Sequence, residues 1–300
     1  MIADAHNDFL TAVKDKLQRT KLVQTFVESG VKVLNCAVFT TEQNLTITDV
    51  ENFAKEVEEY NQTYFIKGKQ VCRFLLSIED IGFVHSANDL LRLVRLKPVS
   101  VTLTWNKNNQ FAGGALDNGG LTRLGKFVVR VLEHNQILVD TAHLNKKSFW
   151  QFKHITTKPL YCSHSNIFAL HPHKRNLTNK QILAIKNSGG FWGLTLYQDF
   201  VSNTKITSKD IANQFEFLFT HFGIKNFGLG SDFFGIDTQK LPQDIKHYKD
   251  LKKVKNCLKS KGFSNTNLSY IMHKNYVCFL SRMYVDKSTS KKLTYRHGNY

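Results

Sequence analysis

The sequence predicts an α/β protein folded as a (β/α)8 TIM barrel, and three observations support this fold class. Short apolar runs alternate with longer segments of helical periodicity along almost the whole chain of 300 residues. The runs are apolar throughout, which is typical of parallel strands that are covered on both faces. No linker or shift in composition marks a domain boundary, and 300 residues is a normal length for one barrel.

The apolar runs give the expected strands in order. They lie at 2–5, 32–39, 72–78, 99–104, 137–141, 159–163, 190–196 and 226–231. Helical periodicity falls at 9–28, 48–65, 87–96, 121–135, 145–154, 178–188, 208–222, 243–260 and 265–283. Eight strands with helices between them favour a closed barrel over an open doubly wound sheet.

Two helix starts have the expected capping chemistry. Thr178 precedes the helix at 180–188, and Ser208 precedes the helix at 209–222, which has Asp210 in its first turn. At the other extreme, residues 286–300 are polar and lysine-rich, and we expect a loosely held tail there. The barrel is therefore assigned to residues 1–285.

Composition narrows the class of protein. Hydrophobic residues make up 42% of the chain and charged residues 22%, as in globular proteins. No signal peptide or membrane-spanning run is visible, and the five cysteines are odd in number and widely spaced, so we expect a cytoplasmic protein without disulfides. The net charge of +17 is strongly basic, but no aromatic residues are interleaved for base stacking. We therefore expect neither a nucleic-acid nor a membrane partner.

Polar residues follow the strands at the end where a parallel barrel carries its chemistry. They are Asp4, His6 and Asp8 at the first strand, Glu79 and Asp80 at the third, Asp140 and His143 at the fifth, Ser163 and His164 at the sixth, and Asp232 at the eighth. Chance would scatter such residues over helix surfaces. This placement predicts one polar site at the barrel mouth.

The residue types at these positions predict two metal ions. His6 and Asp8 alternate along an extended segment, so both can reach one ion. His143 and His164 suit a second ion, and the Glu79 carboxylate can bridge the pair with one oxygen on each. Ions held about 3.5–4 Å apart can lower the pKa of a shared water and provide hydroxide at neutral pH. Asp232 is then placed to accept and return the proton, and the alternatives for it are a third metal ligand or a structural cap at the strand end.

Imidazole and carboxylate ligands without a thiolate suit zinc, although manganese, cobalt or iron could occupy the same shell. The expected class is a metal-dependent hydrolase.

The same segments resemble a known family. In order, the chain contains DAHND, SIED, LTWN, GLTRLGKFVVRVLEHNQILVDTAH, SHSNIFALHPHKRNLTNKQI, GLGSDFFG and, near its end, GF followed by HKN. Together these segments resemble the membrane (renal) dipeptidase family, the M19 metallopeptidases, over nearly all of residues 1–283. The resemblance implies a binuclear zinc barrel that hydrolyses dipeptides, in some members those with a C-terminal D-residue. Family members are often dimers, so a homodimer is open.

Residue by residue, the resemblance supports the same site. His6, Asp8, Glu79, His143 and His164 coincide with the metal ligands of the family, with Glu79 in the bridging position. Asp232 matches its conserved acidic residue beside the metals. Arg175 stands where the family has an arginine that clamps the substrate carboxylate, and Tyr197 stands near a substrate-facing tyrosine.

The chain departs from the family at two positions. Many relatives have a histidine after the fourth strand that is thought to polarise the scissile carbonyl, and here the residue is Trp105. An indole can donate one hydrogen bond but cannot accept one or carry charge. Loss of a donor to a developing oxyanion can lower a rate on the order of 100-fold. A second acidic residue common in the family is Phe234 here, which we expect to alter the rim of the pocket.

Three functions remain open from the sequence. The leading one is a dipeptidase that acts through metal-bound hydroxide. A second is a related amidohydrolase reaction, such as opening of a lactam, a lactone or an N-acyl amino acid, and Trp105 is the residue that favours it. A third is a barrel that binds a ligand without catalysis. The presence of all five ligands and Asp232 argues against the third.

Overall fold

The computed structural model describes residues 1–284 except 42, 43 and 67, so the tail predicted at 286–300 lies outside the described residues. All eight predicted strands are present and parallel, and they close into a barrel in the order β1-β10-β9-β8-β7-β6-β5-β2. The strands are β1 Ile2–Asn7, β2 Val31–Phe39, β5 Arg73–Glu79, β6 Ser100–Thr102, β7 Leu138–Asp140, β8 Tyr161–Cys162, β9 Phe191–Leu194 and β10 Phe227–Leu229. The predicted (β/α)8 TIM barrel is confirmed.

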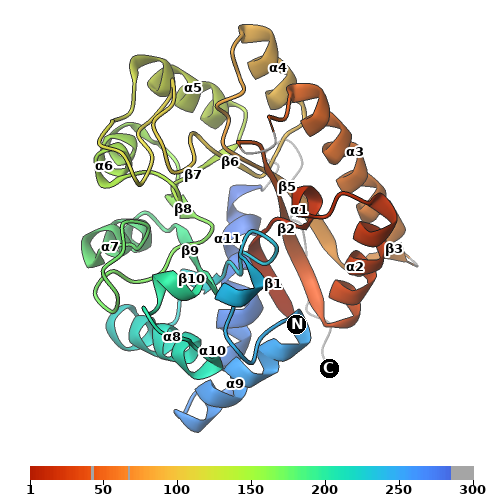
Figure 1. The fold of residues 1–300 in the computed structure, drawn as a ribbon, viewed down its shortest axis with the longest axis vertical. Coiled ribbons are helices and arrows are strands. Elements are labelled where there is room, and N and C mark those ends of the chain that lie inside the picture. Colours follow the sequence, from red (N-terminus) through yellow and green to blue (C-terminus); the bar gives the residue numbers. More distant parts are fainter. Residues whose placement is uncertain (42–43, 67, 285–300) are drawn as a thin grey trace.

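Helices surround the barrel, as Figure 1 shows. The α-helices are α1 Phe9–Ala12, α2 Lys16–Glu28, α3 Ile47–Thr63, α4 Ala87–Arg95, α5 Arg123–His134, α6 Lys146–Ile155, α7 Asn179–Asn187, α8 Ser208–Phe222, α9 Leu251–Ser260, α10 Asn265–Ser269 and α11 Asn275–Met283. Short helical turns are η1 Gln198–Phe200, η2 Thr238–Lys240, η3 Tyr248–Asp250 and the π-helical η4 Tyr270–Lys274. One antiparallel hairpin, β3 Phe65–Ile66 with β4 Lys69–Gln70, was not predicted.

The last helix closes the floor of the barrel, opposite the ends of the strands that carry the polar residues. In Figure 1, α11 lies across the middle of the ring of strands. Its Tyr276 and Phe279 are buried against Tyr161 and Phe191, which come from β8 and β9. The rings of Tyr161 and Phe279 stack at 5.5 Å. The barrel interior is therefore packed rather than open at this end.

Capping side chains fix where several helices begin. Thr178 and Gln181 form a capping box at the start of α7, which confirms that prediction. The prediction of Ser208 as the cap of α8 is wrong by one residue, because Thr207 takes this position. The backbone N–H and the hydroxyl of Thr207 both donate to the carboxylate of Asp210. Ser208 is the first helical residue, and its hydroxyl donates to Asp244.

Two predicted helices are interrupted. The segment 9–28 forms two helices because the side chain of Asp15 accepts from the N–H of Gln18 and starts α2 there. The segment 265–283 contains the π-turn η4 between α10 and α11. The segment 243–260 is α-helical only from Leu251. The breaks are set by the cap at Asp15 and by the π-turn, and hydrophobic periodicity does not report either feature.

The cysteines are all free, as expected from their spacing. Cys36, Cys72 and Cys162 are buried in the core, whereas Cys278 is exposed. Within the described part of the chain, no helix combines the length and apolar character needed to cross a bilayer.

Candidate metal centre and substrate cavity

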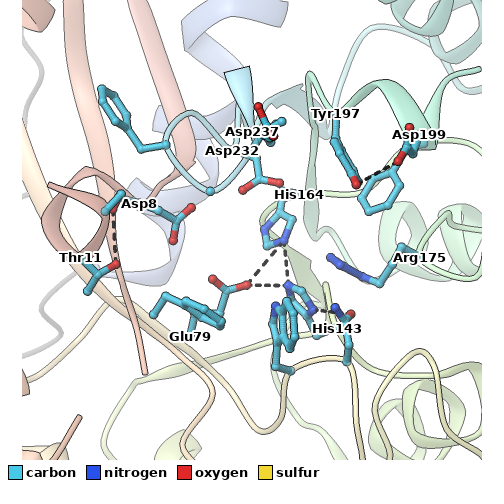
Figure 2. A pocket seen from close by; sticks show the side chains of 18 of the residues that line it. Asp8, Thr11, Glu79, His143, His164, Arg175, Tyr197, Asp199, Asp232 and Asp237 are labelled. Carbon is cyan, nitrogen blue, oxygen red and sulfur yellow. Dashed lines mark hydrogen bonds and ion pairs between the residues drawn. The ribbon is translucent and has the colours of Figure 1, made fainter. Parts of the chain in front are cut away.

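The five predicted ligands converge at the carboxyl ends of the strands. Glu79 ends β5, and its Oε1 lies 2.5 Å from Nε2 of His143 and 3.7 Å from Nε2 of His164. Its other oxygen, Oε2, lies 3.5 Å from Nε2 of His6, which in turn lies 3.1 Å from Oδ2 of Asp8. Figure 2 shows Glu79 between the Asp8 side and the histidine pair. The two oxygens of Glu79 therefore face different imidazoles, and its bridging role stays a prediction.

Several of these buried atoms lack the partners that buried polar atoms normally have. Nε2 of His6 and both carboxylate oxygens of Asp8 are buried without a well-formed hydrogen bond, and the polar contact between these two residues is the 3.1 Å approach of Nε2 to Oδ2. The Nε2 atoms of His143 and His164 lie 3.0 Å apart. Such a contact needs a proton or a cation between the two nitrogens, because two lone pairs facing each other repel. The arrangement therefore fits metal ions, which would satisfy all of these atoms at once.

Hydrogen bonds on the far side of each ring leave Nε2 free to bind a metal. Oδ1 of Asn106 lies 3.1 Å from Nδ1 of His143 and can only accept, so Nδ1 carries the proton. Oγ of Ser163 lies 2.8 Å from Nδ1 of His164 and 3.3 Å from Nδ1 of His6. The backbone N–H of Ser163 in turn donates to Oδ1 of Asp140 at 2.9 Å. One hydroxyl thus orients two ligand rings, as outer partners do in known metal sites.

A second buried carboxylate braces the loop that carries Asp232. Asp4, within β1, accepts from the backbone N–H of Ser231 at 2.8 Å and from the hydroxyls of Ser231 and Tyr248 at 2.5 Å each. These bonds tie the first and last strands of the barrel together next to His6. Asp4 and Asp140 were grouped with the candidate ligands by position, but the structure makes both of them supports of the ligand-bearing segments.

The protonation preferences of His143, His164 and Glu79 match metal binding. For His6, burial lowers the pKa, but the carboxylates of Asp8 and Glu79 outweigh it and raise that pKa well above its usual value when no cation is present. Burial and the nearby charge of Arg175 lower the pKa of His143 to about 3. Burial and the charge of His6 hold the pKa of His164 well below its usual value. Burial alone would raise the pKa of Glu79, but His143 and His6 outweigh it and lower that pKa. Neutral imidazoles beside an ionised carboxylate are the forms that bind metals.

Asp232 lies beside Asp8 on the loop after β10. It has a left-handed backbone with φ of 62°, and the N–H of Asp232 donates to the carbonyl of His6 at 3.1 Å. An added Cβ at Gly235 would lie 2.5 Å from a carboxylate oxygen of each aspartate, so the close approach of Asp8 and Asp232 requires glycine there. A positive φ at a residue with a side chain, as at Asp232, is strained, and such strain is concentrated at functional sites. Figure 2 shows the Asp232 carboxylate pointing toward the metal ligands.

The ligands open into a cavity of about 540 Å³. It is lined by Asp8, Thr11, Ala12, Phe39, Glu79, Trp105, Asn106, Leu116, His143, His164, His173, Arg175, Tyr197, Asp199, Phe200, Asp232, Phe234, Gly235, Ile236 and Asp237. A volume of this size suits a small molecule. All three predicted substrate residues, Trp105, Arg175 and Tyr197, line this cavity.

Arg175 is buried without a carboxylate partner. Its Nε donates to the carbonyl of Ala142 at 2.9 Å, and its guanidinium lies 5.3 Å from the centre of the Phe200 ring. Its Nη2 has no partner at all. A buried guanidinium is normally paired, because an unpaired buried charge is unfavourable. Figure 2 shows this side chain directed toward His143 and His164.

Tyr197 and Trp105 lie in different parts of the cavity. The hydroxyl of Tyr197 donates to Asp199 at 3.0 Å, and Asp199 also pairs with Lys240 at 2.8 Å. Trp105 packs between Phe39, at 5.2 Å between ring centres, and His143, at 5.9 Å. Phe234 is half-buried at the cavity wall, in agreement with its predicted place at the rim.

Several residues of the site were not predicted. Asn106 follows Trp105 directly, and its position in the LTWN segment was the available signal. Asp199 lies two residues after Tyr197, and this closeness to a predicted site residue was the available signal for it. Nothing in the local sequence distinguishes Phe39 or Gly235, because their roles depend on residues far away in the chain.

Fold and site together define a metal-dependent hydrolase, and comparison with known proteins identifies its family. The family model for membrane dipeptidases, peptidase family M19, matches residues 1–291. The chain therefore belongs to this family of metallopeptidases, as the sequence motifs predicted. A protein encoded in the 5′ region of pqqA in Klebsiella pneumoniae is 30% identical over 68% of this chain and 79% of its own length. An uncharacterized dipeptidase of Schizosaccharomyces pombe is 25% identical over 83% of this chain and 73% of its own.

Solved structures show the same fold. A metallopeptidase from Rhodobacter sphaeroides, crystallised with a phosphinate mimic of the dipeptide L-Ala-D-Ala, has a TM-score of 0.81 at 19% identity. The match covers 94% of this chain and 99% of that one. An organophosphorus hydrolase from Deinococcus radiodurans is more distant, with a TM-score of 0.55 at 8% identity over 93% of this chain and 90% of that one.

Proposed function

We propose that this protein is a binuclear zinc dipeptidase that hydrolyses the peptide bond of dipeptides. The observation that carries the proposal is the position of Glu79, because its Oε1 faces Nε2 of His143 and His164 whereas its Oε2 faces Nε2 of His6. One ion would be held by His143, His164 and Oε1 of Glu79, and the other by His6, Asp8 and Oε2. The nitrogen and oxygen donor set suits zinc, and manganese, cobalt or iron could replace it.

When bound, the ions supply Lewis acidity and lower the pKa of a water that they share. The protein side chains do the rest. Asp232, next to Asp8, is the group that takes a proton on the attacking side and returns it to the leaving amine. The Trp105 indole N–H is the donor on the side of the cavity next to His143, where many relatives have a histidine.

Arg175 is the group that restricts the substrate to dipeptides. A guanidinium with a free, buried Nη2 can bind the C-terminal carboxylate of a dipeptide through paired hydrogen bonds. A longer peptide would place an uncharged amide there and leave the buried charge unpaired. The Rhodobacter metallopeptidase with its L-Ala-D-Ala mimic supports the extension of this proposal to dipeptides with a C-terminal D-residue.

A second candidate is another amidohydrolase reaction at the same metals, such as hydrolysis of a lactam, a lactone or an N-acyl amino acid. Trp105 favours it, because an indole cannot act as a charged donor to the scissile carbonyl. L,L-dipeptides, L,D-dipeptides and N-acyl amino acids should be assayed with the metal-loaded protein. Hydrolysis of the N-acyl compounds with no hydrolysis of any dipeptide would favour this second function.

The direct test removes the bridging carboxylate. We predict that Glu79→Gln lowers kcat/KM for dipeptides by more than about 100-fold, a larger loss than removal of an outer-shell partner normally causes. We also expect it to release bound metal, as measured by elemental analysis of the purified protein.

The matched control is Glu133→Gln, which changes another buried glutamate that bonds to Thr157 away from the cavity. A Glu79→Gln protein that keeps two ions per chain and wild-type activity would overturn the assignment of the metal centre.

A further inference from the structure

The cavity has two chemically different walls on opposite sides of the barrel. Arg175 lies on the segment after β8, whereas Phe39 ends β2. In the order of the closed barrel, β2 and β8 are four strands apart in either direction. The guanidinium of Arg175 and the ring of Phe39 therefore line the cavity from opposite sides, with Glu79 and the histidines between them.

The wall near Arg175 is polar. Tyr197, Asp199 and Lys240 form a linked set of hydrogen bonds there, and Asp199 is anchored from two sides. His173 lies next to Arg175 and accepts from its backbone N–H at 3.2 Å. These polar groups satisfy one another. The ring of Phe200 also lines the cavity on this side, but it is buried against Tyr197 and Arg175, so this wall offers little uncovered apolar surface to a substrate side chain.

The wall near Phe39 is apolar, and its side chains are partly exposed to solvent. Phe39 and Trp105 are half-buried, and their ring centres lie 5.2 Å apart. Leu116 also lines the cavity and is 49% exposed. Large apolar side chains at the mouth of a cavity gain free energy when a ligand covers them.

We propose that Phe39 and Trp105, with Leu116, form a subsite for the side chain of the N-terminal residue of the substrate. The inference rests on the proposed dipeptidase function. With the C-terminal carboxylate at Arg175 and the scissile carbonyl over Glu79, the residue before the scissile bond lies toward β2. An aromatic or bulky apolar side chain there packs against Phe39 and Trp105, whereas a methyl group leaves them exposed to water.

The register of the strands explains why Phe39 reaches this position. Phe39 pairs with Glu79 across β2 and β5, so the aromatic ring and the bridging carboxylate come from neighbouring strands at the same level. Trp105 follows β6, the next strand, and its indole spans from Phe39 to His143. The subsite is thus built on the same strand ends as the metal ligands, which fixes its distance from the reacting bond.

The test compares dipeptides that differ only in the N-terminal residue. We expect the metal-loaded wild-type protein to hydrolyse Phe-Ala with a kcat/KM about 10-fold or more above that for Ala-Ala or Glu-Ala, the size of discrimination that apolar pockets give. Phe39→Ala and Trp105→Ala should each lower the ratio of the Phe-Ala value to the Ala-Ala value by about 10-fold. Inhibition constants of phosphinate mimics of the same two dipeptides should shift in the same direction, which separates binding from chemistry.

The control is Phe127→Ala, which removes an exposed phenylalanine on α5, a residue that does not line the cavity. It should leave the ratio unchanged. Should Phe39→Ala fail to fold, Phe39→Leu keeps an apolar side chain and should still lower the ratio. Equal hydrolysis of Phe-Ala and Ala-Ala by wild type, or an unchanged ratio in every subsite variant, would overturn this inference alone. Absence of hydrolysis of any dipeptide would instead overturn the proposed function on which it rests.

Discussion

The two ends of the barrel use the same strands for opposite purposes. At the floor, the hydroxyl of Tyr161 donates to the carbonyl of Ala5 at 3.2 Å and meets the hydroxyl of Tyr276, while the rings pack closely. At the mouth, His6, Asp8 and Arg175 hold buried polar atoms with no partner. The floor is held together by packed aromatic rings, and one buried oxygen there, Oδ1 of Asn35, has no partner. At the mouth, by contrast, the atoms without a partner belong to candidate metal ligands and to a guanidinium, which are groups that an ion or a substrate can satisfy. Stability and chemistry are thus separated along each strand.

Left-handed backbone conformations occur at both ends of the barrel but in different settings. Asp80, Asp232 and Phe234, at the mouth, have φ values of 69°, 62° and 72°. Lys97 and Gln136 also have positive φ, and they lie in the turns that lead into β6 and β7 at the floor. Such conformations are unfavourable for residues with a side chain and persist where the surrounding structure holds them. At the mouth, the one at Asp232 belongs to a loop that carries a candidate catalytic carboxylate.

The largest expected effect comes from a substitution at the floor of the barrel that leaves the residues at the mouth unchanged. Phe279→Ala removes a fully buried ring that stacks on Tyr161 and Phe191. We predict a loss of about 3–5 kcal/mol in the free energy of unfolding, as for other buried aromatic residues, measured by chemical denaturation. Metal content per folded chain should stay at the wild-type value. Loss of metal without loss of stability would show that the two ends are not separable.

A smaller effect is expected when the unpaired charge at the mouth is removed. Arg175→Met should lower kcat/KM for dipeptides by on the order of 100-fold, because a charged partner of the substrate carboxylate contributes about 2–5 kcal/mol. The free energy of unfolding should not fall, since a buried guanidinium with an unsatisfied Nη2 does not stabilise the free protein. Parallel denaturation and steady-state assays measure both quantities. A large loss of stability would show that Arg175 is part of the structural core.

The smallest of the three effects concerns the outer partner of a ligand. Asn106→Ala frees Nδ1 of His143, and we predict a 10- to 100-fold weaker metal affinity, the range found for such partners. Competition with a chelator measures the affinity. Asn135→Ala, at the exposed end of α5, is the matched control and should leave it unchanged. Equal metal affinity in the Asn106 variant and the wild type would show that Asn106 does not support metal binding.

Much of the site could be predicted from sequence, because in a parallel barrel the strand end decides where a side chain goes. His6, Glu79, His143 and His164 each follow an apolar run, so their common location required only the strand assignments and the barrel closure. The apolar runs themselves are local features, and all eight became strands. The family motifs added a prediction for Arg175, that it binds the substrate carboxylate; the structure shows this side chain buried with Nη2 unpartnered.

Other features were decided only by the tertiary structure. Which strands face each other depends on closure of the whole ring, so the opposition of Phe39 and Arg175 has no local signal. The role of Asn106 depends on His143, which lies 37 residues further along the chain. The left-handed turn at Asp232 is likewise held by a contact with β1, the hydrogen bond from the N–H of Asp232 to the carbonyl of His6. Local patterning sets the elements and their ends, whereas long-range packing sets which side chains meet there.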